Sequence, residues 1–219
     1  MSRLNPQDFI ITRKRKKYKF ALFANSPLCF EFDEWDKNYA PRVLEIGAGT
    51  GLFSVAQAAM RPEDDFLAVD VKGDRLQKGA QAAEERHLDN LRFLRARAGR
   101  LEEIIAPHSL DSLWITFPDP FPKERSNGRR LSHPSFLKRY ANLLRPDGAL
   151  YFKTDAHRLF EWSLEQLVGE GWKIGELSFD LHESDLPEAY KIETTYEARY
   201  RREGLAIYFV KACPPERPR

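Results

Sequence analysis

The apolar positions of this chain fall into short runs that alternate with helical patterns over its middle part. Strands are predicted, in chain order, at residues 42–46, 66–69, 91–94, 112–117 and 149–153. Helices are predicted between them at 52–58, 74–87 and 134–144, and a further helix after Asp155, which we expect to be its N-cap. Two later strands are predicted near 172–179 and 205–210. This alternation predicts an α/β fold with a doubly wound, mostly parallel, seven-stranded sheet and helices on both faces.

The chain divides into three zones of different composition. We expect residues 1–40 to form a basic N-terminal extension that is partly flexible, residues 41–211 to form the main α/β domain, and residues 212–219 to form a proline-rich tail. Six of the seven residues from Arg13 to Lys19 are cationic. Because cationic side chains attract phosphate groups, this run is a candidate contact for a nucleic acid.

Composition narrows the class of protein. The length of 219 residues suits about one domain, and 42% of the residues are apolar, enough to fill a core. Lys and Arg number 35 against 33 Asp and Glu, so any basic surface must be local. Two distant cysteines exclude a disulfide scaffold, and the five histidines show no ligand spacing, so we expect no metal site. A charged N-terminus and the lack of an apolar run of about 20 residues predict a cytoplasmic protein without a membrane partner.

A glycine-rich turn follows the first predicted strand, with the sequence Glu-Ile-Gly-Ala-Gly-Thr-Gly at residues 45–51. Alternating glycines let the backbone turn tightly at a strand end and approach a ligand without interference from Cβ. Dinucleotide-binding folds use Gly-x-Gly-x-x-Gly for this purpose, but here the third glycine comes one residue early. The carboxylate of Glu45 would oppose a pyrophosphate, and it could pair with a cationic amino-acid ligand. The pattern resembles motif I of class I S-adenosylmethionine-dependent methyltransferases.

Asp70 ends the second predicted strand, about twenty residues beyond the glycine turn. A carboxylate at this place can accept hydrogen bonds from both hydroxyls of a ribose, whether the ligand is NAD or S-adenosylmethionine. Asp70 therefore supports nucleoside binding without deciding between these cofactors.

The most informative motif follows the fourth predicted strand. Residues 117–123 have the sequence Phe-Pro-Asp-Pro-Phe-Pro-Lys, and three arginines follow at Arg125, Arg129 and Arg130. Prolines on both sides of Asp119 fix φ and remove backbone donors, which holds the carboxylate in one place. A carboxylate close to a lysine and several arginines suits an anionic ligand with a purine edge.

These motifs together resemble the bacterial tRNA (guanine-N7-)-methyltransferases over residues 42–210. The glycine motif is only moderately specific, because many methyltransferases carry it. Phe-Pro-Asp-Pro-aromatic-x-Lys followed by Arg-Arg-Leu, here at residues 129–131, is much more specific. Thr154-Asp155 after the fifth strand and Thr-Thr-Tyr-Glu-x-Arg at residues 194–199 agree with the same family in order and spacing.

The resemblance implies a Rossmann-like class I methyltransferase fold, with S-adenosylmethionine as methyl donor and S-adenosylhomocysteine as product. It implies that Asp119 is the catalytic residue and lies close to the cofactor as well. The other implied cofactor-binding positions are Glu45, Gly47, Gly49, Gly51, Asp70 and Arg97. The implied substrate-binding positions are Lys123, Asp155, Thr194, Thr195, Tyr196 and Glu197. The implied RNA-contacting positions are Arg125, Arg129 and Arg130.

The family substrate is the guanine at position 46 in the variable loop of tRNA. The resemblance therefore implies an RNA-binding tRNA-modification enzyme that methylates N7 of this base. We expect it to act without an obligate protein partner, as a monomer or a homodimer.

Three positions depart from the family pattern. Asp70 stands where Glu is usual, which keeps the charge, and Phe121 stands where Trp is more usual. Arg97 stands where an acid or Asn is often found near the adenine. A guanidinium has only donors and cannot accept from the adenine amino group, so either the backbone of Arg97 and Ala98 contacts the base or the register of the match differs.

Two alternative functions compete with N7 methylation. Residues 118–121 partly resemble the Asp/Asn-Pro-Pro-aromatic motif of exocyclic-amine methyltransferases that act on RNA or DNA, although here one proline precedes the acid. The second alternative is a non-catalytic RNA-binding protein of the same family, and Arg97 is the only residue that favours it. A nicotinamide oxidoreductase is disfavoured by the glycine spacing.

Overall fold

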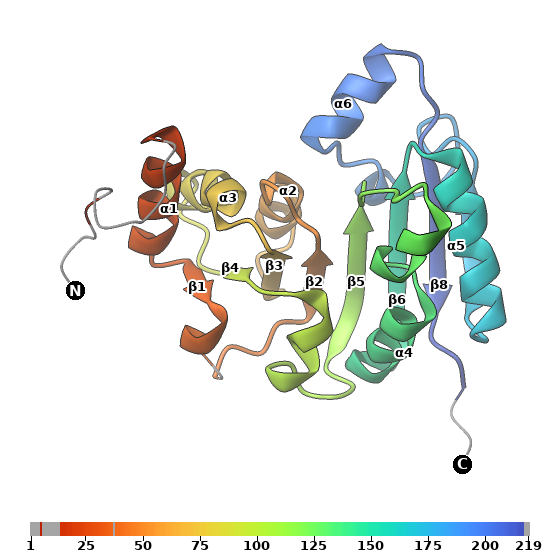
Figure 1. Ribbon diagram of the computed structural model, residues 1–219, viewed down its shortest axis with the longest axis horizontal. Coiled ribbons are helices and arrows are strands. Elements are labelled where there is room, and N and C mark those ends of the chain that lie inside the picture. The colour runs from red at the N-terminus through yellow and green to blue at the C-terminus, as the bar shows by residue number, and fades with distance from the viewer. Residues whose placement is uncertain (1–4, 6–13, 37, 217–219) are drawn as a thin grey trace. The chain divides into compact units, whose positions relative to one another are not determined.

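The computed structural model describes Asn5 and residues 14–36 and 38–216 of the chain. The chain forms two compact units, Met1–Ile104 and Ile105–Arg219 (Figure 1). The residue Arg13 of the basic run lies outside the described residues.

The first unit has four strands with the order β1-β4-β3-β2, and every neighbouring pair is parallel. The strands are β1 (Cys29–Glu31), β2 (Val43–Ile46), β3 (Phe66–Asp70) and β4 (Leu91–Arg95). The helices are α1 (Lys14–Asn25), α2 (Leu52–Met60) and α3 (Gly73–Glu85), with 3₁₀ helices η2 (Phe32–Glu34) and η3 (Ala98–Glu103). All four residues of β2 and the first four of β3 are buried, as expected for strands covered on both faces.

Helix packing in the first unit follows from a few buried positions. On α3, Leu76, Ala80 and Ala83 are fully buried and recur at helical spacing, so one face of α3 lies against the sheet. The basic helix α1 packs on α3, with Ala21 and Phe23 of α1 only 4% and 1% exposed and the Phe23 ring beside Gly73 of α3. The part of the predicted N-terminal extension that forms α1 therefore packs on the first unit.

The second unit has four strands with the order β5-β6-β8-β7. The strands are β5 (Leu110–Thr116), β6 (Leu144–Thr154), β7 (Lys173–Ser178) and β8 (Tyr208–Cys213). β5 and β6 are parallel, whereas β8 is antiparallel to both β6 and β7. The helices are α4 (Pro134–Leu143), α5 (His157–Gly169) and α6 (Thr195–Arg202), with 3₁₀ helices η4 (Glu124–Arg129) and η5 (Glu188–Tyr190). Figure 1 shows α6 beyond the upper ends of β5 and β6.

The predicted α/β class and mostly parallel strands are confirmed, with differences in detail. The described residues form eight strands and not seven, because the three-residue β1 pairs with β4. The last strand begins at Tyr208, three residues later than predicted. Asp155 is not the N-cap of α5: the N-cap is Ala156, which has no side-chain cap, and its N–H donates to Thr154 Oγ1 at 3.1 Å.

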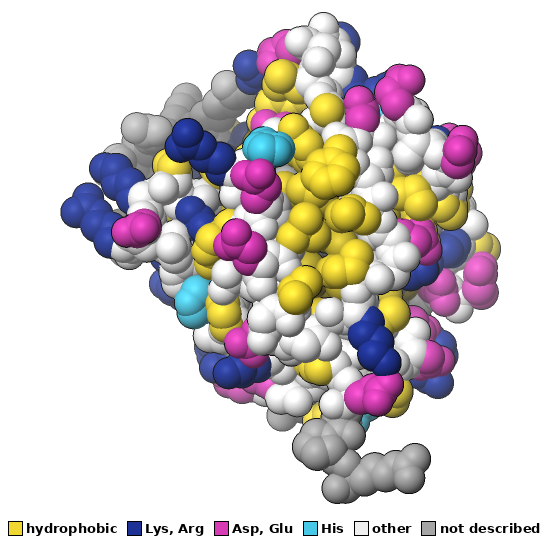
Figure 2. Space-filling model, turned by 90° about the vertical axis from the view of Figure 1, so that its right-hand side faces the viewer, with side chains coloured by type: hydrophobic (Ala, Val, Ile, Leu, Met, Phe, Trp, Pro, Cys, Tyr) yellow, Lys and Arg dark blue, Asp and Glu magenta, His cyan; other side chains and the backbone are white. Residues whose placement is uncertain are grey.

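Figure 2 shows apolar side chains gathered near the centre of the face that lies on the right of Figure 1. In the second unit, exposed large apolar side chains include Val168 of α5, Leu177 of β7 and Phe179 just after β7. The Phe179 ring makes edge contacts with the rings of Phe160 and Tyr208. The second unit itself thus leaves apolar surface exposed on α5 and β7. No helix in the described part of the chain has the length and apolarity that a membrane crossing requires.

Candidate functional site

The glycine turn between β2 and α2 adopts a conformation that requires its glycines. Gly47, Gly49 and Gly51 have φ values of 73°, 57° and 71°, in the left-handed region that residues with a Cβ rarely adopt. The N–H groups of Gly47 and Ala48 both donate to the carbonyl of Val69, at 2.8 and 3.0 Å. These bonds fasten the turn to the end of β3.

The glycines of the turn differ in what surrounds them. A Cβ placed on Gly51 would lie 2.5 Å from the Phe93 ring, whereas a Cβ on Gly49 would have no atom within 4 Å. A Cβ on Gly79 of α3 would lie 2.5 Å from the carbonyl oxygen of Thr50. Gly51 and Gly79 therefore permit close packing, and Gly49 faces open space.

Two carboxylates of the first unit border this turn. Asp70 is half-buried, and its oxygens accept from the N–H groups of Gly49 at 2.9 Å and Lys72 at 2.8 Å. Glu45 is 2% exposed, and its Oε2 accepts from the Ser54 hydroxyl at 2.6 Å. Hydrogen bonds within the protein thus hold both carboxylates in position.

Arg97 follows β4 in the same unit. It is exposed and is the N-cap of η3, with an extended backbone at φ −89°. Its side chain makes no cap hydrogen bond. Its carbonyl accepts from the N–H of Arg100 at 2.9 Å.

In the second unit, β5 ends at the turn that carries Asp119. Phe117 has a left-handed φ of 48°, and its N–H donates to the Lys153 carbonyl at 2.8 Å. Asp119 is exposed, and no described residue gives its carboxylate a hydrogen bond or ion pair. Lys123, four residues later, is exposed as well. The turn therefore presents a carboxylate and an ammonium group that remain available to a ligand.

The three arginines after this turn lie in different surroundings. Arg125 and Arg129 are exposed, and the Arg129 guanidinium lies 4.4 Å from the Phe121 ring centre. Arg130 is only 8% exposed and donates to backbone carbonyls of the Asp119 turn. Arg125 and Arg129 are thus exposed, whereas the guanidinium of Arg130 is directed at backbone carbonyls.

Helix α6 places an aromatic residue beside the Asp119 turn and Asp155. The rings of Tyr200 and Phe117 are 5.8 Å apart. Burial raises the pKa of the Asp155 carboxyl, and burial together with the nearby charge of Asp155 raises the pKa of Tyr200. Tyr200 was not among the predicted site residues, because only the tertiary fold brings α6 to the ends of β5 and β6.

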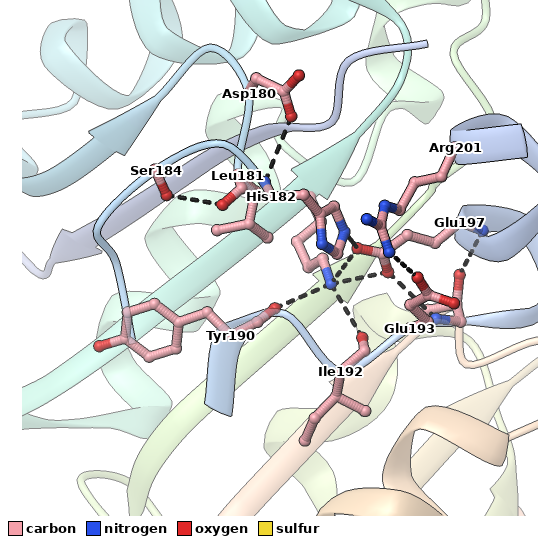
Figure 3. A network of polar contacts seen from close by, with 11 residues as sticks. Asp180, Leu181, His182, Ser184, Tyr190, Ile192, Glu193, Glu197 and Arg201 are labelled. Atoms are coloured by element: carbon pink, nitrogen blue, oxygen red, sulfur yellow. Dashed lines mark hydrogen bonds and ion pairs between the residues drawn. The ribbon is translucent and has the colours of Figure 1, made fainter. Parts of the chain in front are cut away.

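The loop before α6 is fastened by a buried network of charges (Figure 3). Lys153 and Glu197 have fully buried side chains that form an ion pair at 2.8 Å. His182 Nε2 lies 2.8 Å from Glu197 Oε1. Lys153 Nζ also donates to the carbonyls of Tyr190 at 3.0 Å and Ile192 at 3.1 Å. The end of β6 thereby holds the segment that leads into α6.

The same network closes the first turn of α6. The Thr194 hydroxyl accepts from the N–H of Glu197, and the Glu197 carboxylate accepts from the N–H of Thr194, at 3.0 and 3.1 Å. Tyr196, between them, is 45% exposed. The side chain of Thr195 lies outside the part of the chain that the structure describes. Within this motif, Tyr196 faces solvent while Glu197 is committed to partners inside the protein.

Comparison with known proteins assigns the chain to a family. A family model described as "Putative methyltransferase" matches residues 39–210. The tRNA (guanine-N(7)-)-methyltransferase of Cytophaga hutchinsonii is 39% identical over 83% of each chain, and that of Brevibacillus brevis is 36% identical over 89% of this chain and 91% of the relative. The chain belongs to the tRNA (guanine-N(7)-)-methyltransferase family. The family resemblance drawn from the sequence motifs is thus confirmed.

Solved methyltransferase structures have the same fold as this tRNA (guanine-N(7)-)-methyltransferase family member. The 16S rRNA methyltransferase KamB superposes with a TM-score of 0.62 at 20% identity, covering 82% of this chain and 91% of that one. At this identity the likeness concerns the fold, and it confirms the predicted Rossmann-like class I methyltransferase architecture.

Four residues were not among the predicted site residues of this tRNA (guanine-N(7)-)-methyltransferase family member: Gly79, which packs on the glycine turn of the first unit, and Lys153, His182 and Tyr200, which support the loop and helix α6 of the second unit. Two of them left a signal in the sequence. A glycine inside a predicted helix is costly and indicates a close approach, and a lysine within an apolar strand indicates a buried partner. The roles assigned to the predicted site residues remain predictions.

Proposed function

We propose that this protein transfers a methyl group from S-adenosylmethionine to N7 of a guanine in tRNA, giving 7-methylguanosine. The single observation that carries the proposal is the 39% identity, over 83% of both chains, with a relative named tRNA (guanine-N(7)-)-methyltransferase. The carboxylate of Asp119, which lies on a proline-fixed turn and has no partner among the described residues, supports it from the structure.

The first unit fits the methyl donor, which supplies an electrophilic methyl group on a sulfonium sulfur. The open side of Gly49 allows a ligand to approach the backbone of the turn closely. The buried carboxylate of Glu45 suits the ammonium group of the amino-acid part. Asp70 already accepts two backbone N–H groups, and a carboxylate has further lone pairs for the ribose hydroxyls.

Gly49 and Gly51 offer a matched pair of alanine substitutions. Both impose a left-handed φ on a residue with a Cβ, which costs about 1–2 kcal/mol of stability. Gly51→Ala adds an overlap with Phe93, so it is expected to lower the unfolding free energy more than Gly49→Ala. Gly49→Ala is expected to lower the affinity for S-adenosylmethionine more strongly than it lowers stability. Urea unfolding and calorimetric titration measure the two effects, and wild-type affinity in Gly49→Ala would contradict the cofactor placement.

The substrate residues have a task that follows from the chemistry of guanine. N7 carries an in-plane lone pair at neutral pH, so no proton must leave before attack. The lone pair forms the N–C bond as the C–S bond breaks, its electrons return to sulfur, and positive charge develops on the purine. A carboxylate at Asp119 can accept from guanine N1–H and the exocyclic amine, orient the base and stabilise this charge. Asp155 would share the orienting role.

We infer from the family that the target guanine is position 46 in the variable loop. N7 lies on the major-groove edge of the base, which an A-form helix makes hard to reach. A base presented by a loop or by the distorted core of tRNA avoids this obstacle. Lys123, Arg125 and Arg129 are exposed cations beside the Asp119 turn that suit nearby phosphates.

Helix α1 is a second candidate surface for tRNA. Because Ala21 and Phe23 are buried, deleting the start of the helix would damage packing, and neutralising two of its lysines, the exposed Lys16 and the half-buried Lys19, is the cleaner test. Lys16→Gln with Lys19→Gln is expected to lower tRNA affinity about tenfold and to reduce the slope of log affinity against log salt by about 1–2. Filter binding across a salt series measures both.

A matched pair of neutralised lysines controls for net charge in the α1 experiment. Lys138 and Lys173 are 71% and 65% exposed, and each is paired with a glutamate, Glu170 and Glu216. Lys138→Gln with Lys173→Gln is expected to leave the salt slope within error of the wild-type value. An equal loss in both double variants would mean that α1 attracts tRNA only through net charge.

The direct test of function is to incubate the purified chain with labelled S-adenosylmethionine and tRNA, then digest the RNA and identify the labelled nucleoside. The proposal expects 7-methylguanosine, and expects none with a transcript in which G46 is replaced by A. Label in an exocyclic N-methyl nucleoside would favour the amine-methyltransferase alternative. Binding of tRNA without any labelled product would favour the non-catalytic relative. Activity of the chain alone would also support the expected independence from a protein partner.

A further inference from the structure

The Asp119 turn is held in an unfavourable backbone conformation. Phe117 and Phe121, which bracket Pro118, Asp119 and Pro120, have left-handed φ values of 48° and 41°. A non-glycine residue in this region costs about 1–2 kcal/mol. The prolines have no N–H group, so the turn has few backbone donors with which to stabilise itself. Such a conformation persists only when surrounding groups determine it.

Arg130 supplies the missing support. Its Nε donates to the carbonyl of Pro120 at 3.1 Å, and its Nη2 donates to the carbonyl of Phe121 at 3.0 Å. These two carbonyls lie on either side of the left-handed Phe121, so one rigid guanidinium fixes the peptide groups that define its conformation. The turn conformation and the side chain of Arg130 are therefore coupled.

The guanidinium of Arg130 is itself held in place. It lies 4.4 Å from the ring centre of Trp162 on α5, and the residue is 8% exposed. Burial lowers its pKa, and no carboxylate among the described residues forms an ion pair with it. The positive charge of Arg130 is thus stabilised by the carbonyls of Pro120 and Phe121 and by the face of the Trp162 ring.

The adjacent Arg129 contacts the ring of the same phenylalanine. Its guanidinium lies 4.4 Å from the Phe121 ring centre, but the residue is exposed. Arg129 can therefore contact Phe121 and a phosphate at once, whereas Arg130 has its donors directed into the protein. The two neighbours have separate tasks.

We propose that Arg130 is a positioning residue that fixes the Asp119 turn, and that it does not contact RNA. The inference rests on the proposed function, in which Asp119 orients the guanine. Without the guanidinium, Phe121 is free to leave its left-handed conformation, and the carboxylate two residues earlier moves with it. A displacement of about 1 Å in such a group can slow a reaction about 10²-fold.

The test compares Arg130→Met with Arg129→Met, since Met keeps most of the apolar stem and removes the charge. Arg130→Met is expected to lower the single-turnover methylation rate at saturating tRNA and S-adenosylmethionine about 10- to 100-fold. Its tRNA affinity and salt slope are expected to match the wild type. Arg129→Met is expected to show its effect in tRNA affinity, with the salt slope reduced by about 0.7–0.9.

Arg130→Lys separates charge from geometry. An ammonium group keeps the charge but cannot reproduce the planar fork that joins two carbonyls. A slow rate with unchanged tRNA affinity in Arg130→Lys supports the positioning role. Loss of tRNA affinity and salt slope in Arg130→Met, with recovery in Arg130→Lys, would show a phosphate contact and overturn the proposal. A wild-type rate in Arg130→Met would overturn it as well.

Hydrogen exchange measures the turn without relying on activity. In Arg130→Met, faster exchange is expected in peptides that cover residues 117–127, with unchanged exchange over β2 and β3. Should Arg130→Met fail to fold, Trp162→Leu removes the aromatic support from behind and is expected to loosen the same peptides. Unchanged exchange there would overturn the proposal. A wild type that yields no 7-methylguanosine would refute the proposed function, while the exchange result would still decide whether Arg130 fixes the turn.

Discussion

Replacing Asp119 by Asn is expected to lower the single-turnover rate of methyl transfer to tRNA by about 10²–10³-fold. The substitution keeps the size and position of the side chain but removes its negative charge. One amide oxygen can still accept a hydrogen bond, but it cannot stabilise the positive charge that develops on the purine. Rapid-quench measurement at saturating tRNA and S-adenosylmethionine isolates the chemical step from binding.

Two further variants sharpen the Asp119 experiment. Asp119→Glu keeps the charge but moves it by one methylene, so an intermediate loss is expected if orientation matters. Asp147→Asn changes an aspartate whose side chain is 79% exposed at a turn within β6, and it is expected to react at the wild-type rate. If Asp119→Asn kept the wild-type single-turnover rate and weakened only cofactor binding, Asp119 would serve the cofactor and not the guanine.

The fold was largely predictable because the central strands are buried on both faces. Continuous apolar runs such as residues 66–69 identify strands of this kind, and they alternate with helical patterns. What the pattern missed depends on tertiary contacts. Among the described side chains of helix α1, Ala21 and Phe23 are the two that are buried, which is too few to produce a clear helical pattern.

The last strand shows how local chemistry can shift a boundary. The apolar residues from Leu205 predict a strand start there, but Leu205 is 47% exposed and its N–H donates to the Tyr200 carbonyl at 3.0 Å. Together with the left-handed Gly204, this bond ends α6 and delays β8 until Tyr208. A glycine after a cationic helical segment is the signal that indicates such an end.

The candidate site was predictable where one short segment defines it. The glycine turn and the Asp119 motif are each local in sequence, so their places after the first and fourth predicted strands follow from the pattern. The left-handed φ of Phe117 and Phe121 does not follow from it, because residue types alone do not favour that conformation. The surroundings of the second-unit residues are not local: Lys153 meets Glu197 across 44 positions and His182 meets Glu197 across 15. Sequence reasoning also grouped Arg129 with Arg130, because only the packing on Trp162 distinguishes a buried guanidinium from an exposed one.

Removing the charge of Lys153 is expected to have the largest effect on stability. In Lys153→Met the fully buried carboxylate of Glu197 loses its lysine partner and keeps its contacts with His182 and the Thr194 N–H; breaking a buried ion pair in this way costs about 3–5 kcal/mol of unfolding free energy. Lys211→Met is the matched control on β8. Its ion pair with Glu176 is equally short, at 2.8 Å, but the two side chains are 25% and 28% exposed, so a loss of about 1 kcal/mol or less is expected.

Urea unfolding of both variants and of a double variant tests whether the buried pair acts as a unit. Lys153→Met combined with Glu197→Gln removes both charges, so the double variant is expected to be at least as stable as Lys153→Met alone. Because Lys153 also holds the carbonyls of Tyr190 and Ile192, tRNA methylation in Lys153→Met is expected to suffer through a disordered segment before α6. Equal losses in Lys153→Met and Lys211→Met, or additive losses in the double variant, would contradict this account of how β6 holds the loop.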